Sequence, residues 1–192
     1  MIFDAFQLVR PCQGQRVAGD VAVTKTLQDG LLAVIVDVSG HGPKANELAV
    51  KLEHEIMEWP SQDLDGLMRR LDAAAGASRG AAAGVAHFQE AGALRYVGVG
   101  NTRIQRFGAN GWKGVSRDGV LGSRMPSLRP DSTDLDEGDV VALFTDGLSE
   151  RISPSAYPRM GLETPPMIAN KLITLFGKSY DDASCIVIKC RA

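Results

Sequence analysis

The chain has 192 residues, of which 44% are hydrophobic and 23% are charged, and its formal net charge is -2. This length suffices for one ordinary core, so we expect residues 1–192 to form a single domain. The composition excludes a largely disordered chain, a collagen and a coiled coil. Because 21 Lys and Arg residues stand against 23 Asp and Glu, we expect no nucleic acid as the main partner.

The sequence also predicts a soluble, cytoplasmic protein with no membrane partner. Asp4 stands where a secretory signal would carry basic residues. The longest aliphatic run, 31–36, is far shorter than the ~18 residues of a membrane-spanning helix. The three cysteines form neither a disulfide framework nor a CxxC pair, which is typical of a reducing compartment.

The first half of the chain predicts three strands followed by two helices. Strands are expected over 2–9, 20–26 and 31–38, and amphipathic helices from Pro43 onward and over 63–74. The Asp29-Gly30 pair is a hairpin signal between the second and third strands. The near-continuous aliphatic run of the third strand is typical of a strand buried on both faces.

The second half predicts further strands and one more helix. Strands are expected over 81–88, 94–99, 103–107, 140–145 and 184–189, and a helix over 163–176. Strands that look antiparallel, with a few inserted helices, indicate an α+β fold rather than alternating βαβ units. The loop 119–130 contains two glycines and two prolines and is too short to build a subdomain.

The register of the first hairpin brings two acids together. If the turn centres on residues 28 and 29, Thr26 pairs with Leu31, and Asp20 then lies directly opposite Asp37. Like charges in opposite positions of a hairpin destabilise it, so folding alone does not favour this pair. A cation between the two carboxylates would explain it.

Two more acidic positions flank predicted strands. Asp146 follows the strand 140–145, and the Asp181-Asp182 pair precedes the last strand. Sets of carboxylates select hard cations such as Mg²⁺ or Mn²⁺, and two such ions can activate a water for attack on a phosphate. The alternative is that each Asp merely caps a strand or starts a turn.

Five short motifs occur in the order and spacing of one known family. They are 19–20, 36–42, 98–101, 144–148 and 181–184. Together they resemble the type 2C (PPM) metal-dependent serine/threonine phosphatases, and most closely their compact bacterial sporulation and stress-response branch. Within that branch, the run 79–83 and the Gly100-Asn101 turn are similar to the feedback phosphatases of the stressosome.

This resemblance implies a PPM-type domain with an αββα four-layer sandwich of two mainly antiparallel sheets flanked by helices. It implies two ions, Mn²⁺ or Mg²⁺, whose ligands would be Asp20, Asp37, the backbone carbonyl of Val38, Asp146 and Asp181. The same four aspartates would be catalytic through a metal-activated water, and Asp182 would support the ligands. The implied substrate is phosphoserine or phosphothreonine on a STAS-type regulatory protein of a stress-signalling pathway.

The chain departs from the wider family at three of the positions compared, Ser39, Asn101 and Arg16. Larger relatives often carry a histidine at the position of Ser39. We do not assign the role of that histidine to His41, which lies two residues further on. Asn101 stands where many relatives have an acid tied to a third metal. Arg16 lies near the place of a phosphate-binding arginine but is out of register.

Two other functions fit the residues. The chain could be a degenerate phosphatase that only binds a partner, or another two-metal phosphoester hydrolase, although those usually use His-rich clusters and only three His occur here. The short loop 119–130 predicts an open site that relies on docking of a folded substrate. The expected docking positions are Arg124, Met125, Leu128 and Arg129.

Overall fold

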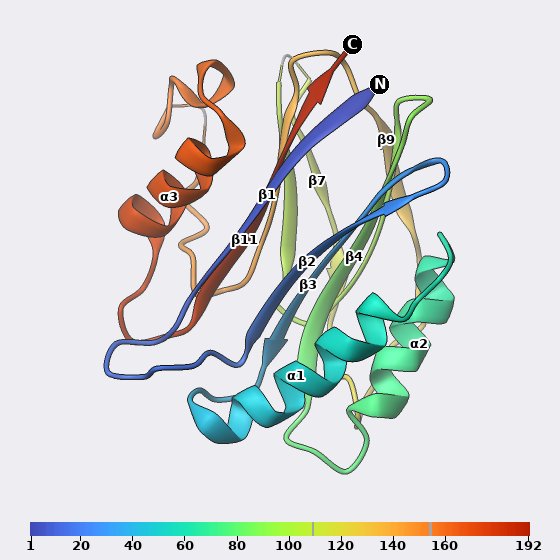
Figure 1. Cartoon of the computed structure of the whole chain (residues 1–192), viewed down its shortest axis with the longest axis vertical. Helices are drawn as coiled ribbons and strands as arrows, with labels where there is room; N and C mark the ends of the chain where they lie inside the picture. The colour runs from blue at the N-terminus through green and yellow to red at the C-terminus, as the bar shows by residue number, and fades with distance from the viewer. Residues whose placement is uncertain (109, 154) are drawn as a thin grey trace.

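Two β-sheets pack face to face, and helices cover both outer faces of the pair (Figure 1). The computed structural model describes residues 1–108, 110–153 and 155–192. The expected α+β sandwich of two mainly antiparallel sheets is confirmed.

The first sheet joins the two ends of the chain. Its order is β1 (Ile2–Arg10), β11 (Ala183–Arg191), β10 (Val140–Phe144), β6 (Arg103–Phe107) and β7 (Trp112–Gly114). Every pair in it is antiparallel, and the register of β1 with β11 runs from Ile2 opposite Arg191 to Arg10 opposite Ala183. The N- and C-termini therefore lie side by side at the top of Figure 1.

The second sheet contains the acidic hairpin. Its order is β2 (Asp20–Leu27), β3 (Gly30–Val38), β4 (Ala81–Gln89), β5 (Ala93–Val99) and β8 (Ser116–Arg117), and β9 (Asp131–Asp134) pairs with β5. Thr26 pairs with Leu31 and Asp20 pairs with Asp37, so the predicted hairpin register is confirmed. The β5–β8 pair is parallel, and the other pairs of this sheet are antiparallel.

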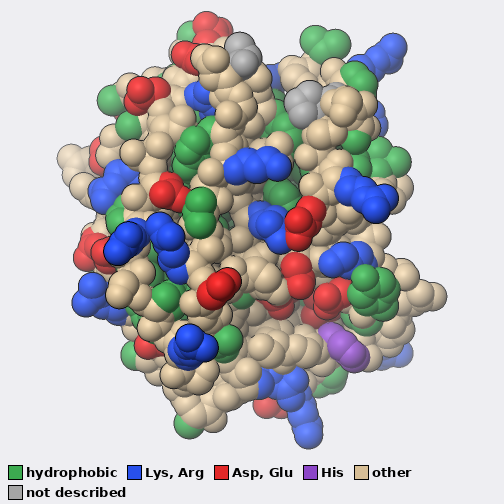
Figure 2. Space-filling view, turned by 180° about the vertical axis from the view of Figure 1, so that it is seen from behind, with side chains coloured by type: hydrophobic (Ala, Val, Ile, Leu, Met, Phe, Trp, Pro, Cys, Tyr) green, Lys and Arg blue, Asp and Glu red, His purple; other side chains and the backbone are tan. Residues whose placement is uncertain are grey.

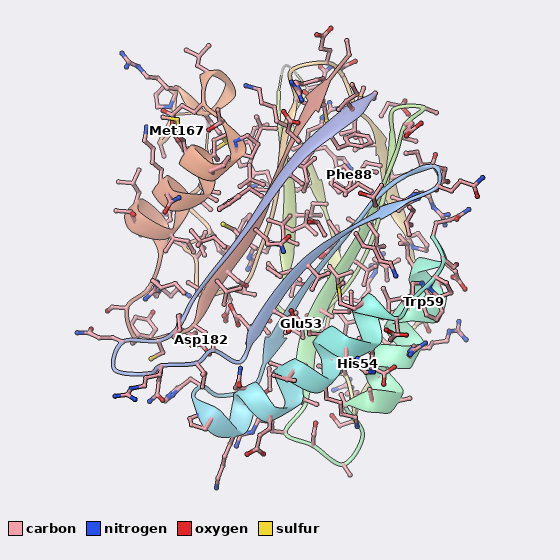
Figure 3. The ribbon with its side chains drawn as sticks, in the orientation of Figure 1. Glu53, His54, Trp59, Phe88, Met167 and Asp182 are labelled. Atoms are coloured by element: carbon pink, nitrogen blue, oxygen red, sulfur yellow. The ribbon has the colours of Figure 1, made fainter. Side chains whose placement is uncertain are left out.

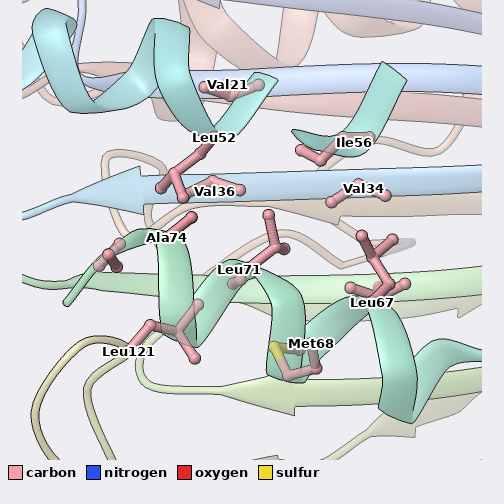
Figure 4. Packing of buried hydrophobic residues seen from close by; sticks show 14 of the residues in the cluster. Val21, Val34, Val36, Leu52, Ile56, Leu67, Met68, Leu71, Ala74 and Leu121 are labelled. Atoms are coloured by element: carbon pink, nitrogen blue, oxygen red, sulfur yellow. The ribbon is translucent and has the colours of Figure 1, made fainter. Parts of the chain in front are cut away.

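Three apolar cores hold the four layers together. The core between the sheets includes Ile35 and Phe88 from one sheet and Leu143 and Ile186 from the other. Helices α1 (Pro43–Met57) and α2 (Leu64–Ala74) pack on the second sheet, as the side chains in Figure 4 show, and α3 (Pro165–Phe176) packs on the first. The short 3-10 helix η1 (Met160–Leu162) precedes α3.

Some predicted boundaries were wrong, and three strands were not predicted. The last helix begins at Pro165 rather than at residue 163, because Thr164 is extended and occupies the N-cap position. Strand β10 ends one residue early, at Phe144. Strands β7, β8 and β9 contain three, two and four residues, which is too short for an alternation pattern to be recognised.

The loop 119–130 folds back onto the helix-side core. Leu121 is fully buried, and its backbone exchanges hydrogen bonds with Ala81. Met125 and Leu128 also pack against this core, so the apolar area that we expected them to offer for docking is reduced. Arg124 and Arg129 are exposed. Within the described ranges, no helix combines the length and apolar character needed to cross a membrane.

Candidate active site

The acidic residues lie at one end of the sandwich because of the strand directions. Asp20 begins β2 and Asp37 lies near the end of β3, and these strands are antiparallel neighbours. Asp146 follows β10 and Asp181 precedes β11, which are antiparallel neighbours in the other sheet. Four acids from distant parts of the sequence therefore meet where the two sheets end.

Asp20 lies deeper than the other three acids. Its side chain is 7% exposed, and its Oδ2 accepts a hydrogen bond of 2.8 Å from the Thr145 hydroxyl. The Thr145 hydroxyl oxygen in turn accepts a bond from the Ser184 backbone N–H at 3.1 Å. This chain of bonds joins the second sheet to the first beside the acids, so Asp20 fixes how the two halves of the site face each other.

Asp182 is a structural brace of the same region. It is 3% exposed, and its two oxygens accept hydrogen bonds of 2.7 Å each from the backbone N–H groups of Cys12 and Gly19. Figure 3 places Asp182 at the end of the sandwich where the β1–β2 connection passes. Asp182 therefore ties this connection to the start of β11, immediately beside Asp181.

A pocket of about 420 Å³ opens at this end of the molecule. Its lining includes three of the four predicted acidic ligands, Asp37, Asp146 and Asp181, together with Asp118. Residues Ser39–Gly40, Ala81–Ala82, Gly100–Asn101 and Gly119–Val120 complete it. Asp20 instead lines a second cavity of about 280 Å³ beside α1, and the buried Val38 is not part of the pocket wall.

Burial and neighbouring carboxylates raise the proton affinity of Asp20, Asp37 and Asp181. Burial, followed by the charges of Asp146 and Asp181, raises the pKa of Asp37 to about 7. Burial and the nearby Asp146 also raise the pKa of Asp181, and burial and Asp37 raise that of Asp20 well above its usual range. The negative charge gathered here is therefore only partly neutralised by the protein.

The donor set fits a hydrated hard cation rather than a closed metal cage. Among the described residues, no three His, Cys, Asp or Glu side chains converge closely enough to enclose an ion. Mg²⁺ keeps several waters and commonly uses only one or two protein carboxylates. An open pocket lined by the carboxylates of Asp37, Asp146 and Asp181 meets that requirement.

Two backbone contacts hold the acidic loops in place. The Lys178 ammonium donates to the backbone carbonyl of Asp146 at 2.5 Å, and its charge lies close enough to Asp181 to act against the rise of that residue's pKa. The Arg10 guanidinium donates to the carbonyl of Lys178 at 2.5 Å. These two cations fix the segment that connects α3 to β11.

Several residues discussed from the sequence lie outside the pocket or only at its edge. Arg16 lines the cavity beside α1, and His41 is exposed and does not contribute to the pocket wall. Ser39 does line the pocket. Asn101 lines it too, and its amide donates to Asp37 Oδ2 at 3.2 Å, so this residue contacts a predicted metal ligand without adding charge.

Sequence reasoning missed Asp118. It is exposed on the pocket wall, directly after β8, whose register with β5 sets Arg117 opposite Val99. The Asp118-Gly119 pair has the form of an ordinary turn, so only the acid-at-a-strand-end pattern could have suggested it. That pattern was invisible because β8 itself was not recognised.

Comparison of the fold with solved structures defines its class. One neighbour comes from work titled "The bacterial stressosome: a modular system that has been adapted to control secondary messenger signaling". It superimposes with a TM-score of 0.90 at 21% sequence identity, and the match covers 98% of this chain and 100% of that chain. RsbX in complex with magnesium superimposes with a TM-score of 0.82 at 20% sequence identity, and the match covers 97% of this chain and 94% of that chain. The PP2C domain of SpoIIE from Bacillus subtilis superimposes with a TM-score of 0.71 at 16% sequence identity, and the match covers 98% of this chain and 63% of that chain. The fold is therefore that of the type 2C phosphatases.

Sequence comparison supplies the family. The profile of Stage II sporulation protein E (SpoIIE) matches residues 28–191, and the chain belongs to this family of PPM-type serine/threonine phosphatases. The curated relative "Phosphoserine phosphatase RsbX" of Bacillus subtilis (strain 168) is 24% identical over 140 residues, which are 71% of this chain and 70% of that protein. The predicted resemblance to the RsbX-like branch is confirmed, and PP2C phosphatases use metal ions.

Proposed function

We propose that this protein hydrolyses phosphoserine or phosphothreonine on a STAS-type regulatory protein of stress signalling, with two Mn²⁺ or Mg²⁺ ions that activate a water. The observation that carries the proposal is the convergence of Asp37, Asp146 and Asp181 from both sheets on one pocket. Burial, followed by the negative charges of Asp146 and Asp181, raises the pKa of Asp37. Gathering like charges does not stabilise the fold, whereas a bound cation would stabilise such a cluster.

The acidic residues would hold the metal ions. Asp37, Asp146 and Asp181 would hold the ions, with Asp20 and the Val38 carbonyl behind them. The chemistry that such ions supply when bound is activation of a water and neutralisation of phosphoryl charge. No cysteine is needed as a nucleophile, and burial raises the pKa of both Cys185 and Cys190 to about 12, which keeps these thiols protonated.

The substrate assignment rests on the relatives and on the shape of the site. A relative of this chain is named a phosphoserine phosphatase, and a structural neighbour was solved in work on the stressosome. The pocket lies on an open surface, and the exposed Arg124 and Arg129 lie on the loop that forms part of its wall. A folded acidic partner would give these arginines a contact that a short peptide lacks.

We also propose that residues 1–192 form a single phosphatase domain. Strands β1 and β11, from the two ends of the sequence, pair along their whole length. The core between the sheets draws residues from both halves of the chain, from Ala22 to Cys190. Separating the halves would therefore expose this core.

The direct test is release of phosphate from a phosphoserine-bearing STAS domain in Mn²⁺, in Mg²⁺ and after EDTA treatment. The proposal expects turnover with either ion and its loss in EDTA. Binding of the phosphorylated domain without any turnover would instead favour the degenerate phosphatase. Faster hydrolysis of a phosphodiester such as bis(p-nitrophenyl) phosphate would favour another two-metal hydrolase.

The docking part of the proposal has its own test. The double variant Arg124→Ala, Arg129→Ala should lower kcat/KM for the intact domain about tenfold, while kcat/KM for a short phosphopeptide stays unchanged. Arg69→Ala, Arg95→Ala, a double variant of two other exposed arginines, is the matched control and should behave as wild type. An unaffected kcat/KM on the intact domain in the first variant would place docking elsewhere.

A further inference from the structure

The acidic pocket wall would repel a phosphoryl group, which is also negatively charged. Four aspartates line the pocket, and in the described part of the chain no lysine or arginine is among the lining residues. A phosphoserine side chain carries a further ~1.5 to 2 negative charges near neutral pH. Bound cations offset part of this charge, but a protein donor at the rim would also have to orient the phosphoryl oxygens.

The guanidinium of Arg79 contacts the pocket wall from outside. Its Nη1 donates to the backbone carbonyl of Ser39 at 3.0 Å. The group also lies directly over Gly40, because a Cβ added at Gly40 would collide with Nη1 and stand 3.6 Å from Cζ. Ser39 and Gly40 both line the pocket, so the guanidinium stands at its edge.

The remaining donors of Arg79 are available to a ligand. A guanidinium has five N–H donors in a planar fork, and the single bond to Ser39 uses one of them. Over the described ranges of the chain, no carboxylate lies within salt-bridge distance of this side chain, although six such pairs form elsewhere. The side chain is exposed, so its charge faces solvent beside an acidic pocket.

The backbone around Arg79 is held firmly for an exposed loop. The Ser78 hydroxyl accepts from the Gly80 N–H at 3.1 Å and donates to the Ala75 carbonyl at 2.5 Å. Ala77 has a φ of 58°, in the left-handed region, which tightens the turn after α2. The Ser39 N–H donates to the Gly80 carbonyl at 3.0 Å, so this loop and the pocket wall form one unit. Such an arrangement lowers the entropy cost of using the side chain for binding.

We propose that Arg79 binds the phosphoryl oxygens of the substrate from the rim of the pocket, an inference that rests on the proposed phosphatase function. The planar fork of a guanidinium matches two phosphate oxygens, and an ammonium does not. Arg79 thus supplies the positive side chain that the pocket wall lacks. It would act in ground-state binding and orientation, next to a site whose other side chains are acidic.

Binding of inorganic phosphate to the Mg²⁺-loaded protein tests this inference without turnover. Calorimetry should show that Arg79→Ala weakens phosphate binding about tenfold or more, as expected for loss of a charge-assisted bond. Arg79→Lys should recover only part of the affinity, because it restores the charge and not the fork. Arg69→Ala, which removes an exposed arginine from α2, should bind phosphate as wild type does.

Kinetics on the phosphoserine domain supply the second readout. In Arg79→Ala the KM should rise by the same factor as the phosphate dissociation constant, with a smaller change in kcat, and the Mg²⁺ affinity and melting temperature should stay at wild-type values. Unchanged phosphate binding in Arg79→Ala overturns the inference. A parallel loss of Mg²⁺ affinity and melting temperature also overturns it, because Arg79 would then only pin the turn at Ser39. Phosphate binding is measured even if wild-type protein shows no turnover, so failure of the proposed function is seen separately.

Discussion

Gly147, immediately after Asp146, tests whether the backbone at the pocket is as tightly packed as the structure indicates. A Cβ placed at Gly147 would overlap the carbonyl oxygen of Asp182 and lie 2.8 Å from its carbonyl carbon and 2.9 Å from Ala183 Cα. These atoms are backbone, so no side-chain rotation relieves the clash. Gly147→Ala should therefore push the Asp146 loop away from the start of β11 and cost about 2 kcal/mol, as overpacking usually does.

The assay pairs unfolding with metal binding. A cost of about 2 kcal/mol corresponds to a melting temperature lower by roughly 4–8 °C for a domain of this size, and displaced ligands should lower Mg²⁺ affinity about tenfold. Gly161→Ala is the matched control, since nothing lies within 4 Å of its added Cβ. Its stability should stay within about 0.5 kcal/mol of wild type. Wild-type stability and Mg²⁺ affinity in Gly147→Ala would refute the packing argument.

Three further predictions concern stability. The pKa of Asp37 is about 7 in the folded protein and 3.8 ordinarily, so the free energy of unfolding of the metal-free protein should fall by up to about 4 kcal/mol as pH rises through this window. Urea titrations in EDTA should find a smaller fall in Asp37→Asn. Asp182→Ala leaves the buried N–H groups that it satisfies without partners and should cost about 3 kcal/mol in chemical denaturation; a loss under about 1 kcal/mol would contradict the brace. Leu71→Ala truncates a fully buried side chain of α2 and should cost about 2–5 kcal/mol. Leu175→Ala truncates a side chain that is 61% exposed and should cost under about 0.5 kcal/mol, and equal costs would contradict the assigned core.

The sequence predicted those parts of the fold that local signals determine. The Asp29-Gly30 turn fixed the hairpin register, and with it the pairing of Asp20 with Asp37. Strands β8 and β9 could not be predicted in this way. Both pair with β5 through contacts that are distant in the sequence, and neither is long enough to show alternation.

The candidate site was predictable to the same extent. Acids at the ends of long strands pointed to Asp37, Asp146 and Asp181, and the strand directions bring them together in one pocket. The depth of Asp20 was not predictable, because it depends on a hydrogen bond from Thr145 in the other sheet. The position of Arg79 likewise depends on how the loop after α2 folds against Ser39, and no sequence pattern encodes that contact.

Two charge-removing variants show whether the pocket acids support metal-dependent turnover. Asp146→Asn neutralises a pocket acid, and Asp134→Asn neutralises an exposed acid on β9. With saturating Mn²⁺ and a phosphoserine-bearing STAS domain, we expect Asp146→Asn to lower kcat at least about a hundredfold, as loss of a metal ligand should. Asp134→Asn should keep wild-type kcat. Equal turnover by the two variants would contradict a metal-dependent phosphatase site built on these carboxylates.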